Sequence, residues 1–213
     1  LGTNRGIHIN KYFDTHNIRK IHAIDEDKND IKDFETRFDK TLSKKDNNIK
    51  LEWILQGDFT NLLTYGDSIQ GVDKETLNNF YKTSGFYYFD LIINHNTINK
   101  AFKNEYTLRA FIHNIFLNLQ VGGYFVGTVL DGNNIYKRFI QERENIIQGG
   151  TSKTGIWKIE KLFNEKSLLN FGQEISVQFT NVSLNEYTQY LVNFEYMTNI
   201  LKEEYDIEII SEI

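Results

Sequence analysis

The 213-residue sequence contains neither cysteine nor proline. Without cysteine there are no disulfides, thiolate metal sites or cysteine nucleophiles, so an apolar core must hold the fold together. No apolar run approaches the roughly 20 residues that a membrane helix needs, and the opening residues do not follow a signal-peptide pattern. We therefore expect an intracellular protein that does not associate with membranes.

The remaining composition is that of a globular protein, with 40% hydrophobic and 25% charged residues. At this length roughly 70% of the unfolded chain's surface can be buried, so we expect a single domain over residues 1–213. The net charge of −5 argues against a dedicated nucleic-acid clamp but leaves room for a local basic groove. Because the chain starts at Leu1 rather than Met, we expect it to be a piece of a longer one.

Hydrophobic periodicity predicts strands that alternate with helices. The expected strands are 18–25, 51–55, 86–94 and 124–130, and the expected helices are 28–42, a segment from about 108 to a stop at Gly122-Gly123, and 134–142. The stretch 59–85 has weak periodicity, which suggests a helix plus an irregular insertion. This alternation is typical of an α/β fold with a mostly parallel, twisted sheet flanked by helices.

The last third of the chain has a different pattern. Residues 148–155 are typical of a linker, and 156–163 and 174–179 alternate like two antiparallel strands beside the sheet. A helix over 185–204 and a last strand over 207–210 are expected to follow.

Ligands of open α/β sheets bind beyond the carboxyl ends of the strands. That rule selects the loop from Gly2 to Gly6, Asp25, the Gly57-Asp58 pair and the segment 94–100. An acid about 20 residues after a glycine-containing turn commonly holds a ribose diol. Gly2, Gly6 and Asp25 have this spacing, which also fits ordinary turn glycines and a solvated strand end.

Several segments together resemble a known family. In chain order they are LGTNRGIHINKY, KIHAIDED, TRF, LQGD, FDLIINHNTINKAF, LQVGGYFVGTVLDGNNIYKR and TQYLV, of which the block from Val121 to Arg138 is the most specific. This order resembles the messenger-RNA cap methyltransferases that act on guanine N7. It is most similar to the domain in multifunctional capping enzymes of large DNA viruses.

The resemblance implies a Rossmann-like methyltransferase that uses S-adenosylmethionine. It implies a fragment that lacks the first and the C-terminal strands, with an insertion over 148–185 near the cap site. The implied donor-binding residues are Gly2, Gly6, Asp25, Asp58 and His95. His95 replaces a family glutamine, His8 replaces an acid, and Asn4 replaces a glycine.

The implied substrate-binding residues are Arg5, Arg37, Asn99, Lys100, Gln189 and Tyr190. Asn99-Lys100 stands where the family has a His-Tyr pair. Gln189 replaces a glutamate that binds the guanine edge, and an amide offers one neutral acceptor where a carboxylate offers two charged ones. Glu186, three residues earlier on the expected helix, is a candidate substitute.

No catalytic base is expected, because guanine N7 carries a free lone pair and attack on a sulfonium methyl needs only alignment. The five histidines lack metal-ligand spacing, so no metal site is expected either.

Three functions therefore stay open. The first is a cap guanine-N7 methyltransferase. The second is a catalytically degenerate module that serves as a scaffold or stimulatory part of a capping assembly. The third is a methyltransferase that uses Lys100 and Gln189 to bind another substrate. The resemblance implies capped RNA as partner, with triphosphatase and guanylyltransferase domains on the same polypeptide. A viral protein of this kind would lie in the host cytoplasm or the virion.

Overall fold

The structure, a computed structural model, describes residues 1–14, 18–45, 49–65, 69–70, 89–151, 155–180 and 186–210. The chain forms two compact units. The first comprises residues 1–95 and 113–127, and the second comprises residues 96–112 and 128–213. No helix in these described ranges is long and apolar enough to span a membrane.

The first unit begins with the predicted strand, helix and strand. β1 (Lys20–Asp25) and β2 (Lys50–Gly57) pair in parallel, with Asp25 opposite Gln56. Between them α2 (Lys28–Leu42) covers the predicted residues and starts at Asp27, whose side chain accepts a hydrogen bond from the backbone N–H of Asn29 at 2.7 Å. These predictions are confirmed because a regular apolar stripe and a capping acid define the helix locally.

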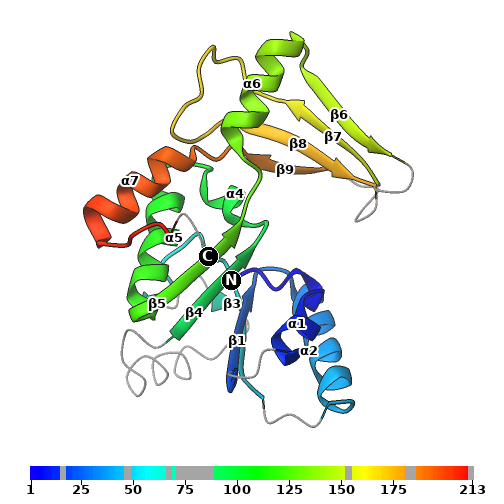
Figure 1. Cartoon of the computed structure of the whole chain (residues 1–213), viewed down its shortest axis with the longest axis vertical. Coiled ribbons are helices and arrows are strands. Elements are labelled where there is room, and N and C mark those ends of the chain that lie inside the picture. The colour runs from blue at the N-terminus through cyan, green and yellow to red at the C-terminus, as the bar shows by residue number, and fades with distance from the viewer. Residues whose placement is uncertain are drawn as a thin grey trace. The chain divides into compact units, whose positions relative to one another are not determined.

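α2 packs against both strands. A short 3-10 helix, η1 (Asn4–Gly6), precedes α1 (Ile9–Asp14), which packs against α2 (Figure 1). Their shared core consists of Ile9, Phe13, Ala23, Phe34, Phe38 and Ile49. This core fixes the turn that contains Gly2 and Gly6 at the carboxyl end of β1.

The region after β2 is only partly described. It contains η2 (Leu63–Tyr65) and the short β3 (Ile69–Gln70), which pairs antiparallel with β2. Most of the helix and insertion predicted for 59–85 lies outside the described residues.

β4 (Phe89–His95) and β5 (Leu119–Thr128) form a two-stranded sheet. The expected helix is α5 (Glu105–Asn118), but its predicted stop at Gly122-Gly123 is wrong because both glycines lie inside β5. A Cβ at Gly123 would lie 3.0 Å from the carbonyl oxygen of Asp90. Gly123 therefore permits close approach between strands rather than ending a helix.

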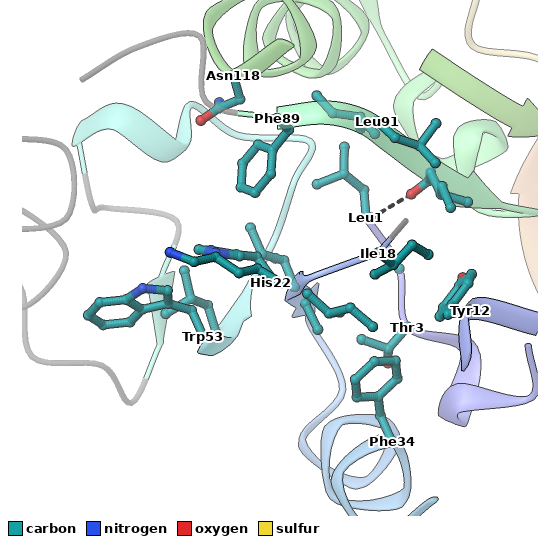
Figure 2. Close-up of a pocket in the computed structure, with 18 of the residues that line it drawn as sticks. Leu1, Thr3, Tyr12, Ile18, His22, Phe34, Trp53, Phe89, Leu91 and Asn118 are labelled. Carbon is teal, nitrogen blue, oxygen red and sulfur yellow. Dashed lines mark hydrogen bonds between the residues drawn. The ribbon is translucent and has the colours of Figure 1, made fainter. Parts of the chain in front are cut away.

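An apolar groove of about 920 Å³ in the first unit is lined by residues of both β1 and β4. Figure 2 shows Leu1 between the two strands, with a dashed hydrogen bond from its amine to the carbonyl of Ile93 at 2.7 Å. The backbone N–H of Gly2 donates to the carbonyl of Ile24 at 2.9 Å. The first two residues thus join β4 to β1 at one end of the groove.

The second unit contains a four-stranded antiparallel sheet in the order β6 (Ile146–Thr151), β7 (Gly155–Lys161), β8 (Glu174–Phe179) and β9 (Tyr187–Tyr190). α6 (Gly132–Glu142) lies against one face (Figure 1). Between helix and sheet is an apolar core of Ile135, Phe139, Ile147, Ile159, Phe163, Ile175, Val177 and Leu191. The predicted β7–β8 pairing is confirmed.

Three predictions in this unit are wrong: the linker over 148–155, the helix over 185–204 and the strand over 207–210. Residues 148–151 belong to β6 rather than to a linker, since Gly149 and Gly150 pair with Trp157 and Ile156. The predicted helix 185–204 is replaced by β9 followed by α7 (Phe194–Tyr205). Pairing with β8 overrides the helical pattern up to residue 190, and Asn193 then caps α7 by accepting from the N–H of Tyr196 at 3.1 Å.

The chain thus contains both strands and helices, as the α/β class requires. The described strands form three small sheets: a mixed one of β1, β2 and β3, one of β4 and β5, and the antiparallel one of β6 to β9. The single, mostly parallel sheet that the sequence predicted is not among the described sheets. No strand is present over the described residues 207–210, where the sequence predicted one, because Asp206 ends α7 in a left-handed conformation and irregular chain follows.

Candidate functional site

The loop from Gly2 to Gly6 is a tight turn at the carboxyl end of β1. Gly2 and Gly6 have φ angles of 74° and 71°, which only glycine adopts without strain. A Cβ at Gly6 would also meet Phe34 at 3.2 Å. The turn closes by a hydrogen bond from the N–H of Gly6 to the carbonyl of Thr3 at 2.9 Å. Both glycines therefore have a conformational reason to be there.

The carboxylate of Asp25 holds this loop by hydrogen bonds. Its Oδ2 accepts from the backbone N–H of Thr3 at 2.6 Å and from the hydroxyl of Thr3 at 3.0 Å. Its Oδ1 accepts from the N–H of Asp27 at 3.0 Å. The residue is only 7% exposed. Since a carboxylate oxygen accepts two hydrogen bonds, Oδ1 retains capacity for one more donor, such as a ribose hydroxyl.

Asp58 follows the carboxyl end of β2, the strand next to β1. Its Oδ1 accepts from the N–H and the hydroxyl of Thr60 at 2.8 and 2.7 Å, and its Oδ2 accepts from the side chain of Asn61 at 2.8 Å. Asn114 of α5 fixes the same turn by donating to the carbonyl of Asn61 at 2.8 Å. Asp58 and Asp25 thus end neighbouring parallel strands, as the sequence predicted.

His95 ends β4 and contacts His8, with the two ring centroids 4.1 Å apart. Burial is the main cause that lowers the pKa of each imidazole below its usual value of 6.5. The positive charge of Lys11 lowers both pKa values further, and His8 adds to the effect on His95. Both rings are therefore neutral at pH 7.5.

The two arginines predicted to bind substrate differ. Arg5 has a φ of 55°, and its Nε lies 2.9 Å from a carboxylate oxygen of Asp30 and 4.0 Å from one of Asp33. Hydrogen bonding to Asp30 raises the pKa of Arg5. Arg37 is exposed on α2, and within the described ranges its guanidinium has no ion-pair partner. Arg37 is accordingly the arginine that remains available to an anion.

The other predicted substrate residues belong to the second unit. Asn99 lies on α4 (Ile98–Ala101), is fully buried, and donates from Nδ2 to the carbonyl of Tyr190 at 2.9 Å. Its Oδ1 accepts from the N–H of Leu130 at 3.5 Å. Lys100 follows it and is half-buried. Asn99 therefore ties α4 to β9 through its side chain.

Gln189 of β9 pairs with Ile175, so its side chain lies on the face of the sheet that α6 covers. It is 6% exposed, and within the described part of the chain its Oε1 accepts no hydrogen bond. Glu186 is not on a helix with Gln189, contrary to expectation. It pairs with Lys158 at 3.0 Å and accepts from Ser176, which lies on the opposite face.

Each unit thus holds part of the predicted site. The first contains Gly2, Gly6, Asp25, Asp58, His95, Arg5 and Arg37, and the second contains Asn99, Lys100, Gln189 and Tyr190. Only Gly2 and His95 of the donor set line the apolar groove. Thr3 and Asn114, which hold the loops in place, were not predicted from the sequence. A polar Asn114 among the apolar residues of α5 was the available signal.

The family model of the mRNA (guanine-N(7))-methyltransferase domain matches residues 1–213. The chain belongs to this family. Guanine-N7 methyltransferases use S-adenosylmethionine as the methyl donor. A comparison with curated proteins found no match. Among the described residues of this methyltransferase domain no cluster of acids and histidines suits a metal ion.

Proposed function

We propose that this chain transfers a methyl group from S-adenosylmethionine to N7 of the guanine in a 5′ RNA cap. The observation that carries the proposal is the Gly2–Gly6 loop, in which Thr3 donates two hydrogen bonds to the carboxylate of Asp25. The family match over residues 1–213 supports the same function.

The described residues fit such a donor. Asp25 and Asp58 end neighbouring strands, and each carboxylate has one oxygen that accepts a single hydrogen bond and so has room for another. Gly2 and Gly6 leave the backbone at both ends of the loop without side chains, and His95 borders the same loop. When bound, the donor supplies the electrophilic methyl, and these residues orient it.

For the cap, we assign Arg37 to the phosphate bridge, supported by its exposed guanidinium. Gln189 is assigned to the guanine edge, supported by its buried Oε1, which is the kind of acceptor that a guanine N–H would satisfy. Arg5, Asn99, Lys100 and Tyr190 complete the proposed set. Arg5 must leave Asp30 to contact phosphate, and Asn99 acts by holding β9 rather than by direct contact.

We further propose that capped RNA is made by triphosphatase and guanylyltransferase domains that act with this one, as the likeness to viral capping enzymes implies. The degenerate-scaffold alternative gains nothing from the family match.

The test is calorimetric titration with S-adenosylhomocysteine, followed by methyl transfer to capped RNA. Asp25→Asn keeps the size of the side chain but removes its charge and one acceptor. We expect binding to be weaker by about 10- to 100-fold, since a hydrogen bond to a charged group contributes about 1.5–3 kcal/mol.

Asp39→Asn, on the exposed face of α2, serves as control and should bind as the unaltered chain does. A folded chain that binds no S-adenosylhomocysteine, or that binds it and leaves capped RNA unmethylated, would overturn the proposal.

A further inference from the structure

Two imidazoles lie in contact beside the loop that Gly2 and Gly6 form. His8 follows Gly6 by two residues, and His95 is the last residue of β4. Their ring centroids are 4.1 Å apart, with planes tilted by 42°. The amine of Leu1 donates to Ile93, two residues before His95, which brings the start of the loop to the same place. A ligand held by this loop therefore lies next to both rings.

The charged groups that act on the pair are all basic. Lys11 of α1 faces both rings. Among the described residues no carboxylate contributes to the electrostatics of either ring. Acid therefore adds positive charge to the two imidazoles, next to the positive charge of Lys11.

The methyl donor and its product differ by one charge. S-adenosylmethionine carries a positive sulfonium, whereas S-adenosylhomocysteine has a neutral thioether and the same amino acid and nucleoside. Neutral imidazoles accept either molecule. Protonated imidazoles repel the sulfonium and leave the thioether unaffected, because Coulomb repulsion acts only between charges.

We propose that the His8–His95 pair determines how the site discriminates between the charged methyl donor and its uncharged product, with acid shifting the preference to the product. This inference rests on the proposed function, since it needs a site that binds these two molecules.

The experiment measures the affinities of S-adenosylmethionine and S-adenosylhomocysteine by calorimetry at pH 7.5 and at pH 5.5. In the ratio of the two affinities, any effect of pH that changes both affinities equally cancels. We expect the ratio to move about fivefold toward the product at pH 5.5, the size expected for one screened charge pair in a partly solvated site. Circular dichroism at both pH values checks that the chain stays folded.

The variant with both His8→Gln and His95→Gln should show a ratio that pH does not move, although it keeps Lys11. His22→Gln is the matched control. His22 pairs with Glu52 at 2.9 Å and takes no part in the ring contact between His8 and His95, so this variant should shift as the unaltered chain does.

The outcomes separate the two proposals. A folded chain that binds neither molecule at either pH contradicts the proposed function. Binding of both with an unchanged ratio overturns the role of the histidine pair and leaves the function standing. Should the double variant fail to fold, imidazole Hε1 titrations by NMR decide instead. The pKa values of His8 and His95 should be lower in the S-adenosylmethionine complex than in the S-adenosylhomocysteine complex, and equal values would refute the inference.

Discussion

Gln189 and Asp25 are polar side chains that the fold buries almost completely, yet they are satisfied to different degrees. The carboxylate of Asp25 accepts three hydrogen bonds. Within the described residues the Oε1 of Gln189 accepts none. An unsatisfied buried acceptor costs about 1–3 kcal/mol, so Gln189 lowers the stability of the chain in the absence of a ligand.

Replacing Gln189→Leu should therefore raise the free energy of unfolding by about 1 kcal/mol, because the orphaned acceptor disappears and the apolar neighbours stay packed. Under the proposed function the same change should weaken cap binding. Urea unfolding and a capped-RNA binding assay measure the two effects. Gln178→Leu, outside the proposed site on β8, is the control for cap binding. A destabilised Gln189→Leu variant would contradict this account.

Histidine protonation should make stability depend on pH. Burial, which comes first among the causes, lowers the pKa values of His8, His22 and His95 below 6.5 in the folded chain. The unfolded chain therefore binds protons first as the pH falls. The free energy of unfolding should be steady above about pH 7 and should decrease as the pH passes below 6.5.

Urea unfolding at pH 7.5 and 5.5 checks this, and the His22→Gln variant should lose less stability between the two values. Equal losses in both chains would show that His22 does not contribute.

At the scale of elements, the loop around η1 depends on glycine for two separate reasons. Gly6 and Gly122 share a positive φ, of 71° and 80°, but a Cβ at Gly6 meets Phe34 at 3.2 Å whereas one at Gly122 meets nothing within 4 Å. Gly122→Ala thus reports the backbone strain alone. Gly6→Ala adds a steric clash at the predicted donor loop.

We expect Gly122→Ala to destabilise the chain by about 1 kcal/mol and Gly6→Ala by about 2–3 kcal/mol. Only Gly6→Ala should weaken binding of S-adenosylhomocysteine. Thermal unfolding measures the stability of the two variants, and calorimetry measures their binding of S-adenosylhomocysteine. If both changes weakened binding equally, the special role of Gly6 in the donor loop would be contradicted.

Local signals explain which elements the sequence predicts well. α2 is predicted to the residue because its stripe and its cap at Asp27 need no partner. The boundary between β9 and α7 is missed because β9 forms by pairing with the backbone of another strand, β8, which the side-chain pattern of 185–204 does not encode. Gly149 and Gly150 look like linker residues in sequence for the same reason, since only Gly155 and Trp157 across the hairpin show that a side chain would clash there.

The start of α7 offers a direct test. Asn193 accepts a hydrogen bond from the N–H of Tyr196 at 3.1 Å. Asn193→Ala should lower the free energy of unfolding by about 1 kcal/mol. Asn199→Ala, on the exposed face of the same helix, should leave stability unchanged or raise it slightly, because alanine has the higher helix propensity. Urea unfolding of both variants measures this, and equal losses would mean that Asn193 is not the cap.

For the whole molecule, charge limits how the chain can hold RNA. The net charge is −5, Arg5 is bound to Asp30, and Arg138 to Glu142 at 2.7 Å. The proposed phosphate contacts are therefore few. We expect the logarithm of the affinity for a capped oligonucleotide to fall with the logarithm of salt concentration with a slope of about −1 to −2.

Removing the charge in Arg37→Gln should make that slope shallower by about 0.7. Arg138→Gln, which removes a paired arginine, should leave the slope as it is. Fluorescence anisotropy at several salt concentrations gives both slopes, and a steep slope that Arg37→Gln does not change would place the phosphate contacts elsewhere.

The sequence predicts the mixed α/β class and the residues at the ends of β1 and β2, because these follow from apolar runs and the polar residues after them. It does not predict that the described strands form three small sheets. Sheet order depends on which strand edges meet, and that is decided by packing between segments far apart in the chain.

The groove between β1 and β4 has a consequence for handling the protein. It is lined with side chains such as Ile21, Leu55 and Leu91, and in the described chain β1 and β4 each end their sheet. Strand edges beside an open apolar surface are where chains adhere to one another. The folded protein should therefore increase the fluorescence of a hydrophobic dye, and its light scattering should rise with protein concentration. An added peptide that pairs with these strand edges should lower both the fluorescence and the scattering.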